Sequence, residues 1–254
     1  MGIFAYKIKC LTNLHVGSGD LNYNIVDNEV ERDPVTGYPV IHASGLKGAL
    51  REHFSNKNDI AFDITDVFGQ ESGSDKIKAG SYKFLDARLL ARPMRTSGQE
   101  SSVMVVSERS VNDFIRLMND FGVTKFGAEL LNVEFPKGVN FLSNVSNARV
   151  EAETTGAIPQ NAMNILNDLK DLIGDKIAVV KDFNDYDLPV VARNCLEDGE
   201  SKNLWYEEIV PHDSVFYTFI ITPENKMELD FEDIIQIGGN ASIGCGFTKF
   251  TKQN

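Results

Sequence analysis

Apolar residues alternate with polar ones over several short stretches of this chain, which is the pattern of half-buried β-strands. Near the start, Phe4, Tyr6, Ile8 and Cys10 fall on one side of such a strand at residues 3–12. The same alternation, or a short run of β-branched residues, predicts further strands. They are expected at residues 82–93, 102–107, 177–180, 188–191, 215–222 and 247–250.

Elsewhere the apolar residues recur at helical spacing. After Ser44, a good N-cap, an apolar stripe predicts a helix at residues 44–54. A second pattern starts at Ser110 and stops before Gly122, and a third runs from Pro159 to a stop at Gly174. A last short helix is expected after Asp230, with Phe231, Ile234 and Ile235 facing inward.

The order of these elements is typical of an α+β protein with a ferredoxin-like or RRM-like core and elaborations. We expect one domain over residues 1–254, with insertions at about residues 55–80 and 123–190. The pair Asp198-Gly199 lies between two strand-like runs and is a hairpin turn signal. It predicts a projecting β-hairpin at residues 191–209.

An acidic stretch precedes the first predicted helix. Asp27, Glu29, Glu31 and Asp33 fall on every second residue, so in a strand their carboxylates would share one face. This is either an acidic ridge that can hold a metal ion or a solvated edge. The start of the following helix, with Ser44 and one or two cations nearby, is a place to hold phosphate.

The chain carries a net charge of −12, which argues against a free-standing, non-specific nucleic-acid binder. Any RNA site must therefore be a local basic groove. One short region holds several cations next to few acids, and two more on the first helix can join them in space, although each alone is an ordinary surface charge. These cations are Lys83, Arg88, Arg92, Arg95 and Arg109, together with Lys47 and Arg51.

Several other classes are not supported by the motifs. No apolar run resembles a signal peptide or a membrane span, so we expect a cytoplasmic chain with no membrane partner. In the glycine-rich stretch 237–246, Cys245 and Gly246 stand where a P-loop needs Lys and Ser or Thr. The three cysteines show no zinc or disulfide spacing. Of the four histidines, His15 beside a glycine-containing loop has the best claim to a site.

Taken together, the motifs resemble the signature of the RAMP proteins of CRISPR systems. The motifs are LHVGSGD at 14–20, VD at 26–27, RDPVTGYP at 32–39, LKGALR at 46–51 and the glycines of 238–246. Two further stretches, DARLLARP at 86–93 and LWYEEIVP at 204–211, are similar to the backbone subunits of the type III-B (Cmr) effector complexes.

This resemblance implies an RRM-like core and copies of the chain stacked along a guide CRISPR RNA, together with other Cmr subunits. It also implies a thumb-like hairpin that interrupts the guide–target duplex, and metal-dependent cutting of the target RNA with Mg²⁺ or Mn²⁺. Asp27 matches the catalytic, metal-holding aspartate, and His15 and Glu208 match positions near the site. Lys47, Arg51 and the loop glycines match RNA contacts. The full predicted RNA-binding set is Ser44, Lys47, Arg51, Arg88, Arg92, Arg95, Gly238, Gly239, Gly244 and Gly246.

Two alternatives stay open. The chain could be a purely structural guide-binding subunit in which Asp27 is inert. It could also be a guide-processing endoribonuclease of the same superfamily, which would need a His or Lys constellation near the glycine loop, where His15 is the one candidate.

Overall fold

Strands make up most of the regular structure among the described residues. The computed structural model describes residues 1–17, 26–70, 78–97, 100–123 and 126–253. The large sheet contains β1 (Gly2–Cys10), β2 (Val40–Ile41), β3 (Lys83–Phe84), β4 (Ala87–Ser97), β5 (Ser102–Ser107), β6 (Phe141–Ser143), β7 (Arg149–Val150), β8 (Glu153–Ala157), β9 (Ile177–Val180), β12 (Val215–Thr222), β13 (Ile234–Gln236) and β14 (Phe247–Gln253). A separate hairpin consists of β10 (Val190–Glu197) and β11 (Glu200–Glu208).

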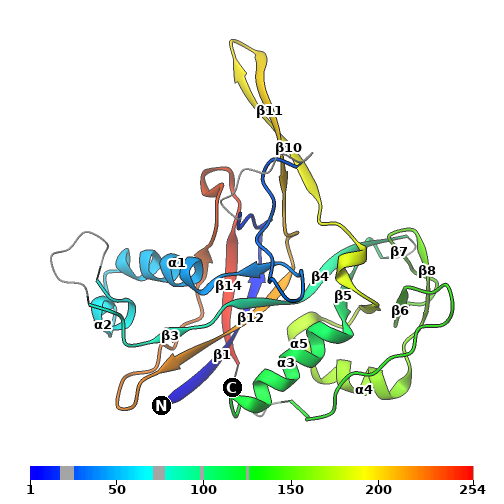
Figure 1. Cartoon of the computed structure of the whole chain (residues 1–254), viewed down its shortest axis with the longest axis horizontal. Coiled ribbons are helices and arrows are strands. Elements are labelled where there is room, and N and C mark those ends of the chain that lie inside the picture. The colour runs from blue at the N-terminus through cyan, green and yellow to red at the C-terminus, as the bar shows by residue number, and fades with distance from the viewer. Residues whose placement is uncertain (18–25, 71–77, 98–99, 124–125, 254) are drawn as a thin grey trace.

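Helices cover both faces of the large sheet (Figure 1). They are α1 (Ala43–Ser55), α2 (Ile64–Phe68), α3 (Glu108–Asp120), α4 (Gln160–Asp168) and α5 (Lys170–Ile173), with short 3₁₀ turns η1 (Phe183–Asp185) and η2 (Ala241–Ile243). The strand order is β13-β14-β1-β12-β4-β5-β9-β6-β8-β7, with β2 beside β4 and β3 beside β12. The chain is therefore an α+β protein with one large sheet.

Strand alternation divides the core into two clusters. On β1, Tyr6 and Ile8 pack with Leu50 of α1 on one face, whereas Ala5, which precedes Tyr6, packs with Phe114 of α3 on the other. Each fully buried side chain of this size contributes about 1.5–3 kcal/mol relative to exposure. The predicted alternation along the first strand is confirmed.

The register of the sheet gathers three loops at one edge. β1 runs antiparallel to both β12 and β14, with Lys9 opposite Val215 and Cys10 opposite Thr248. The end of β1, the start of β12 and the start of β14 therefore lie together. The residues that follow or precede these points are 11–17, the base of the hairpin before β12, and the glycine-rich loop 237–246. Figure 1 shows the hairpin projecting from this edge.

The helix starts differ from those predicted. The N-cap of α1 is His42 and not Ser44, which lies exposed within the first turn. The Ala43 N–H donates to Asp86 Oδ1 (2.7 Å), so a carboxylate already occupies this helix end. In α3, Ser107 is the N-cap, and its hydroxyl accepts a hydrogen bond from the Ser110 N–H (3.0 Å).

Two further predictions for helices need correction. The predicted helix 159–173 is broken at Leu169 into α4 and α5. The predicted helix after Asp230 is wrong, because residues 234–236 form β13, an edge strand paired with β14. Phe231 and Ile235 are both buried at a spacing of four, which imitates a helix, but Ile234 between them is 56% exposed.

The predicted hairpin is present as β10 and β11. Its turn, Asp198-Gly199, has positive φ at both residues (52° and 83°), which is what a type I′ turn requires. The strands pair from Val190 opposite Glu208 to Glu197 opposite Glu200, with a bulge between Cys195 and Leu196. Most of its side chains are exposed except at the base.

Candidate functional site

Asp27 lies beside the base of the β10–β11 hairpin. Its backbone N–H and that of Asn28 both donate to the Tyr206 carbonyl (3.0 and 3.2 Å). In return, the Tyr206 N–H donates to Asp27 Oδ2 (2.8 Å), and the Glu208 N–H donates to the Asn28 carbonyl (2.9 Å). The segment that follows residue 26 thus runs along β11, and the half-buried Asp27 carboxylate is held at a defined position.

His15 is anchored to the same strand. It is buried, and its Nδ1 lies 2.7 Å from the Glu208 carbonyl oxygen. A carbonyl can only accept, so Nδ1 carries the hydrogen, and Nε2 of the neutral ring is the acceptor. The His15 carbonyl accepts from the Gly239 N–H (2.9 Å), which fixes the glycine-rich loop against this residue.

The carboxylate of Glu208 is bonded to other residues inside the fold. Its Oε1 lies 2.5 Å from Arg32 Nη2, and its Oε2 accepts from the Val30 N–H (3.0 Å). The side chain is 9% exposed. These contacts hold the segment after Asp27 against β11, so the geometry favours a positioning role for Glu208.

The neighbouring Glu207 is the most heavily bonded carboxylate at the hairpin base. Its Oε1 accepts from Trp205 Nε1 (2.8 Å) and its Oε2 from Arg193 Nε (3.1 Å). Asn240 Nδ2 also donates to Oε2 (2.8 Å), and Asn28 Nδ2 lies 3.4 Å from Oε1. Burial raises the pKa of Glu207, but the hydrogen bonds from Trp205 and Arg193 outweigh it and leave that pKa below its ordinary value.

The four acids of residues 27–33 do not form a continuous ridge. The residues are joined to their neighbours by isolated bridges instead of a regular ladder. Glu31 Oε1 lies 3.2 Å from His42 Nε2, whereas Asp33 Oδ1 accepts from the N–H groups of Val35 (3.0 Å) and Thr36 (2.7 Å). Among the described residues there is no group of three or more His, Cys, Asp or Glu side chains that could hold a metal ion.

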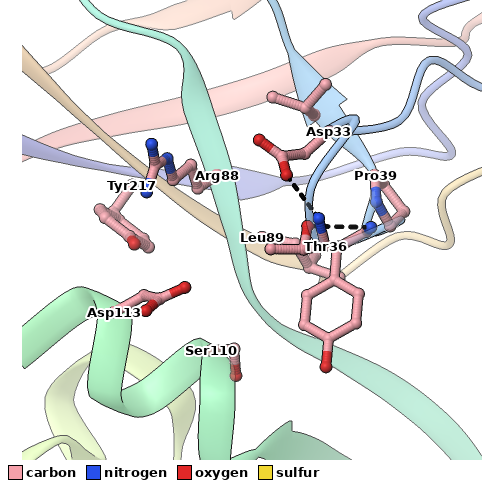
Figure 2. Close-up of a pocket in the computed structure, with 10 residues that line it drawn as sticks. Asp33, Thr36, Pro39, Arg88, Leu89, Ser110, Asp113 and Tyr217 are labelled. Atoms are coloured by element: carbon pink, nitrogen blue, oxygen red, sulfur yellow. Dashed lines mark hydrogen bonds between the residues drawn. The ribbon is translucent and has the colours of Figure 1, made fainter. Parts of the chain in front are cut away.

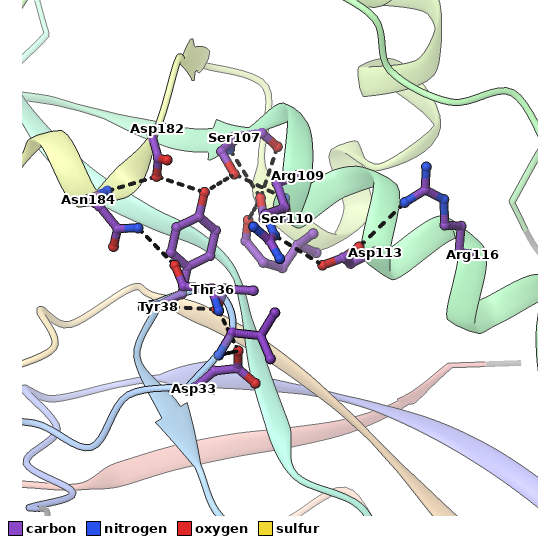
Figure 3. A network of polar contacts seen from close by, with 12 residues as sticks. Asp33, Thr36, Tyr38, Ser107, Arg109, Ser110, Asp113, Arg116, Asp182 and Asn184 are labelled. Atoms are coloured by element: carbon purple, nitrogen blue, oxygen red, sulfur yellow. Dashed lines mark hydrogen bonds and ion pairs between the residues drawn. The ribbon is translucent and has the colours of Figure 1, made fainter.

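A polar network fixes the turn that ends this segment (Figure 3). The Tyr38 hydroxyl lies 3.1 Å from both Ser107 Oγ and Asp182 Oδ1. Asn184 Nδ2 donates to the Thr36 carbonyl (2.8 Å). The turn is therefore tied to α3 and to the residues after β9, and Asp33 belongs to its architecture.

The predicted cations are distributed over several surfaces. Lys47 and Arg51 lie one turn apart on α1 and are half-buried. Arg88 is exposed and lines a small pocket with Tyr217, Asp33 and others (Figure 2). The Arg95 side chain is 89% exposed and pairs with Glu151 at 3.2 Å. These four cations therefore do not form one compact basic cluster.

Arg92 is a correction to the predicted RNA contacts. It is 3% exposed, and its guanidinium donates to the carbonyls of Tyr186 (2.6 Å), Asp187 (3.2 Å) and Phe183 (3.4 Å). Burial lowers its pKa to about 10. Arg92 holds the residues after β9 against β4 and cannot contact RNA from this position.

The loop glycines fall into two kinds. A Cβ on Gly238 (φ +81°) would lie 2.3 Å from the His15 carbonyl oxygen, and one on Gly246 (φ +82°) would lie 2.0 Å from the Ile237 carbonyl oxygen. These two glycines are required by packing. Around Gly244 a Cβ would meet nothing within 4 Å, and at Gly239 the nearest atom would be 3.8 Å away. Gly239 and Gly244 are exposed and leave the loop surface open to a partner.

The sequence did not reveal Glu207 as the centre of this site. Its partners are separated from it by 179 positions at Asn28, 33 at Asn240 and 14 at Arg193. No local spacing connects them, and a pair of acids after an aromatic pair is also typical of a solvated strand edge. Residues 18–20 of the predicted glycine-containing loop lie outside the described residues.

Comparison with known proteins identifies the family to which the chain belongs. The model of the RAMP superfamily matches residues 7–249, so the chain belongs to the RAMP superfamily. Within it, the chain is similar to the CRISPR system Cmr endoribonuclease Cmr4 of Pyrococcus furiosus, with 30% identity over 99% of this chain and 96% of that protein. The CMR subunit Cmr4 of Saccharolobus solfataricus is 28% identical over 96% of this chain and 94% of that protein.

Solved structures show the same fold. A chain of the type III-B Cmr-beta complex bound to cognate target RNA superposes with a TM-score of 0.74 at 21% identity, covering 99% of this chain and 97% of that chain. Oligomeric Cmr4 from Pyrococcus furiosus gives a TM-score of 0.69 at 22% identity, covering 100% and 98%. The predicted family membership is confirmed.

No helix among the described residues is both long enough and apolar enough to cross a membrane.

Proposed function

We propose that this chain is a backbone subunit of a type III-B CRISPR effector complex that binds guide RNA and cuts complementary target RNA. Its copies would stack along the guide next to other Cmr subunits, in the cytoplasm. Full-length similarity to a Cmr endoribonuclease supports this. The observation that carries it is the Asp27 carboxylate, held by the Tyr206 N–H at the base of a projecting hairpin.

The RNA-binding surface in this proposal is local, because the net charge of −12 repels RNA elsewhere. Lys47 and Arg51 on α1 supply charge. Exposed Gly239 and Gly244 let a sugar-phosphate backbone come close to the loop. At the start of α1, the Ala43 N–H already donates to Asp86. This helix start would therefore contribute less to phosphate binding than the cations do.

The hairpin would act as a thumb that interrupts the guide–target duplex. Leu196 and Leu204 on it are 64% and 55% exposed, which suits contact with unstacked bases. We interpret the antiparallel strands β14-β1-β12-β4, with α1 on one face, as a ferredoxin-like core that carries this thumb.

The chemistry we propose is in-line attack of a target ribose 2′-oxygen on its own 3′-phosphate. A new P–O bond forms at the 2′-oxygen, the bond to the 5′-oxygen of the next nucleotide breaks, and that leaving oxygen takes up a proton from solvent water. A nucleotide pulled out of A-form stacking can reach the in-line geometry. The Asp27 carboxylate, oriented through Oδ2, would hold or accept the 2′-hydroxyl proton, and His15 Nε2 is a second acceptor at the same edge.

A divalent ion fits this site only if RNA completes it. Asp27 offers one carboxylate, and the described residues contain no preformed cluster of metal ligands. Asp27 would hold Mg²⁺ or Mn²⁺ together with phosphate oxygens and water, in keeping with the oxygen ligands these ions prefer. When bound, the ion would supply charge stabilisation for the phosphorus centre.

The test is to incubate the assembled complex with end-labelled complementary RNA. We expect fragments at regular intervals, no fragments from non-complementary RNA, and loss of cutting with a chelator that Mg²⁺ or Mn²⁺ reverses. Intact complementary RNA in the presence of metal would overturn the cleavage proposal. Cutting that persists at full rate in the presence of the chelator would overturn the proposed metal dependence.

A purely structural guide-binding subunit is the second candidate. One observation favours it, because the Asp27 carboxylate already has a structural partner in the Tyr206 N–H. In that case the complex would bind complementary RNA and leave it intact.

A further inference from the structure

The base of the hairpin is joined to two other segments through one buried carboxylate. Glu207 is 5% exposed and accepts from Arg193 on β10 and from Trp205 on β11, so it bonds both strands of the hairpin. It also accepts from Asn240 in the glycine-rich loop. Asn28, which follows Asp27, lies 3.4 Å from it.

The main effect of these hydrogen bonds is to fix the direction of the hairpin relative to the sheet, and not to bury more surface. Beyond its base, the hairpin is a two-stranded sheet of its own with mostly exposed side chains. Its tilt against the body therefore depends on the contacts at its base. These are the bonds of Glu207, the bonds of Glu208 with His15, Val30 and Arg32, and the short pairing of β11 with residues 27–30. A carboxylate that takes charge-assisted hydrogen bonds from several elements is a strong restraint on their mutual orientation.

We propose that Glu207 is a positioning residue that sets the tilt of the hairpin relative to Asp27 and to the glycine-rich loop. This inference rests on the proposed function, in which the hairpin displaces target nucleotides and Asp27 acts on them. Tyr206, next to Glu207, bonds Asp27 directly, so a shift at Glu207 moves the carboxylate and the hairpin together.

The chain offers a natural reporter of hairpin tilt. Cys195 on β10 is exposed, whereas Cys10 and Cys245 are buried. A maleimide fluorophore would therefore react at Cys195, and time-resolved anisotropy of the folded chain without RNA would measure motion of the hairpin. This readout does not depend on cleavage.

We expect Glu207→Gln to lower the residual anisotropy of the label, because a Gln amide keeps one acceptor oxygen and its NH₂ must face one set of donors, either Arg193 and Asn240 or Trp205 and Asn28. Glu200→Gln on the exposed part of the same hairpin is the matched control and should leave the anisotropy unchanged. Asn240→Gly is the second variant, since Gly tolerates the φ of +63° at this position and the substitution removes the side chain that donates to Glu207. The double variant Glu207→Gln with Asn240→Asp reverses the donor and acceptor and should restore the anisotropy in part.

In the assembled complex, Glu207→Gln should cut target RNA about 10²-fold more slowly or at shifted positions, as expected for a misplacement of about 1 Å. Guide binding should stay at the wild-type level.

Wild-type anisotropy in both Glu207→Gln and Asn240→Gly would overturn the proposal, even if either variant melts at a lower temperature. Wild-type cleavage positions and rate in Glu207→Gln would overturn it too. An inactive wild-type complex would instead refute the proposed function, while the anisotropy comparison would still decide whether Glu207 holds the hairpin.

Discussion

At the residue scale, cations of equal formal charge do different work in this chain. The guanidinium of Arg92 donates hydrogen bonds to three backbone carbonyls inside the fold, whereas Lys47 is half-buried on α1. Both belonged to the predicted RNA-binding set. The strand alternation around Arg92 could not reveal this, because its partners lie 91 to 95 positions further along the chain.

Lys47→Glu should weaken guide-RNA binding and lower the magnitude of the slope of log K against log salt by about one per copy, as for one lost phosphate contact. Folding should be retained, because the buried stripe of α1 is Leu46, Leu50 and Phe54. The measurement is a binding titration over a salt series. Lys137→Glu, an exposed residue between α3 and β6, makes the same charge change elsewhere. Equal affinities and slopes for the two variants would remove Lys47 from the RNA site.

Asp33 predicts a pH dependence of stability. Burial raises its pKa, but the backbone N–H groups of Thr36 and Val35 outweigh this and hold the pKa of the folded state below its ordinary value. Its contribution is therefore complete above the unfolded pKa of about 3.9 and is lost as pH falls through the lower, folded value. Asp33→Asn should be less stable at pH 7 and lose less stability on acidification. Denaturant unfolding between neutral and acid pH measures this, and parallel curves for wild type and variant would contradict it.

At the element scale, local patterns predicted those elements whose residues carry their own signals. The hairpin follows from Asp198-Gly199, and β5 and β12 follow from runs of β-branched and aromatic residues. The helix expected after Asp230 failed because the periodicity of Phe231 and Ile235 arises from packing in a loop and an edge strand. The candidate site was only partly predictable. Asp27 and His15 lie in recognisable motifs, but the bonds of Glu207 join segments brought together by the β1, β12 and β14 register.

Two neighbouring glycines of the glycine-rich loop should differ in their roles, because packing requires Gly238 whereas Gly239 is available to bind RNA. Gly238→Ala should destabilise the chain by about 2 kcal/mol or more, because its φ is +81° and the new Cβ would meet the His15 carbonyl oxygen at 2.3 Å. Gly239→Ala, whose Cβ would have no neighbour closer than 3.8 Å, should melt like wild type and yet bind guide RNA more weakly. Thermal melts and binding titrations of the pair test this. Wild-type RNA affinity in Gly239→Ala would show that RNA does not approach this loop.

The hairpin can be shortened without disturbing its base. Removing Leu196, Glu197 and residues 200–202 leaves Asp198-Gly199 as the turn between Cys195 and Asn203, which already face each other. Stability should be nearly unchanged because the removed side chains are exposed. Target cleavage should fade or lose its regular spacing on a sequencing gel. A wild-type pattern would place the duplex-interrupting element elsewhere.

At the scale of the whole molecule, the fold brings the residues of the candidate site together at one edge of one sheet. The loop after β1, the hairpin before β12 and the glycine-rich loop before β14 meet there (Figure 1), and Asp27 lies among them. An acidic chain can still bind RNA there if stacked copies align their local cations along the guide, since screening confines each repulsion to about 8–10 Å.

The most direct test of the account is target cleavage by an assembled complex that carries Asp27→Asn. The variant keeps the size of the side chain and removes its charge, so it should bind guide and target like wild type and cut target RNA at a greatly reduced rate. Glu29→Gln and Glu31→Gln in the same segment are the matched controls and should cut. Wild-type cutting by Asp27→Asn, or equal loss of cutting in all three variants, would contradict the assignment of Asp27 as the catalytic carboxylate.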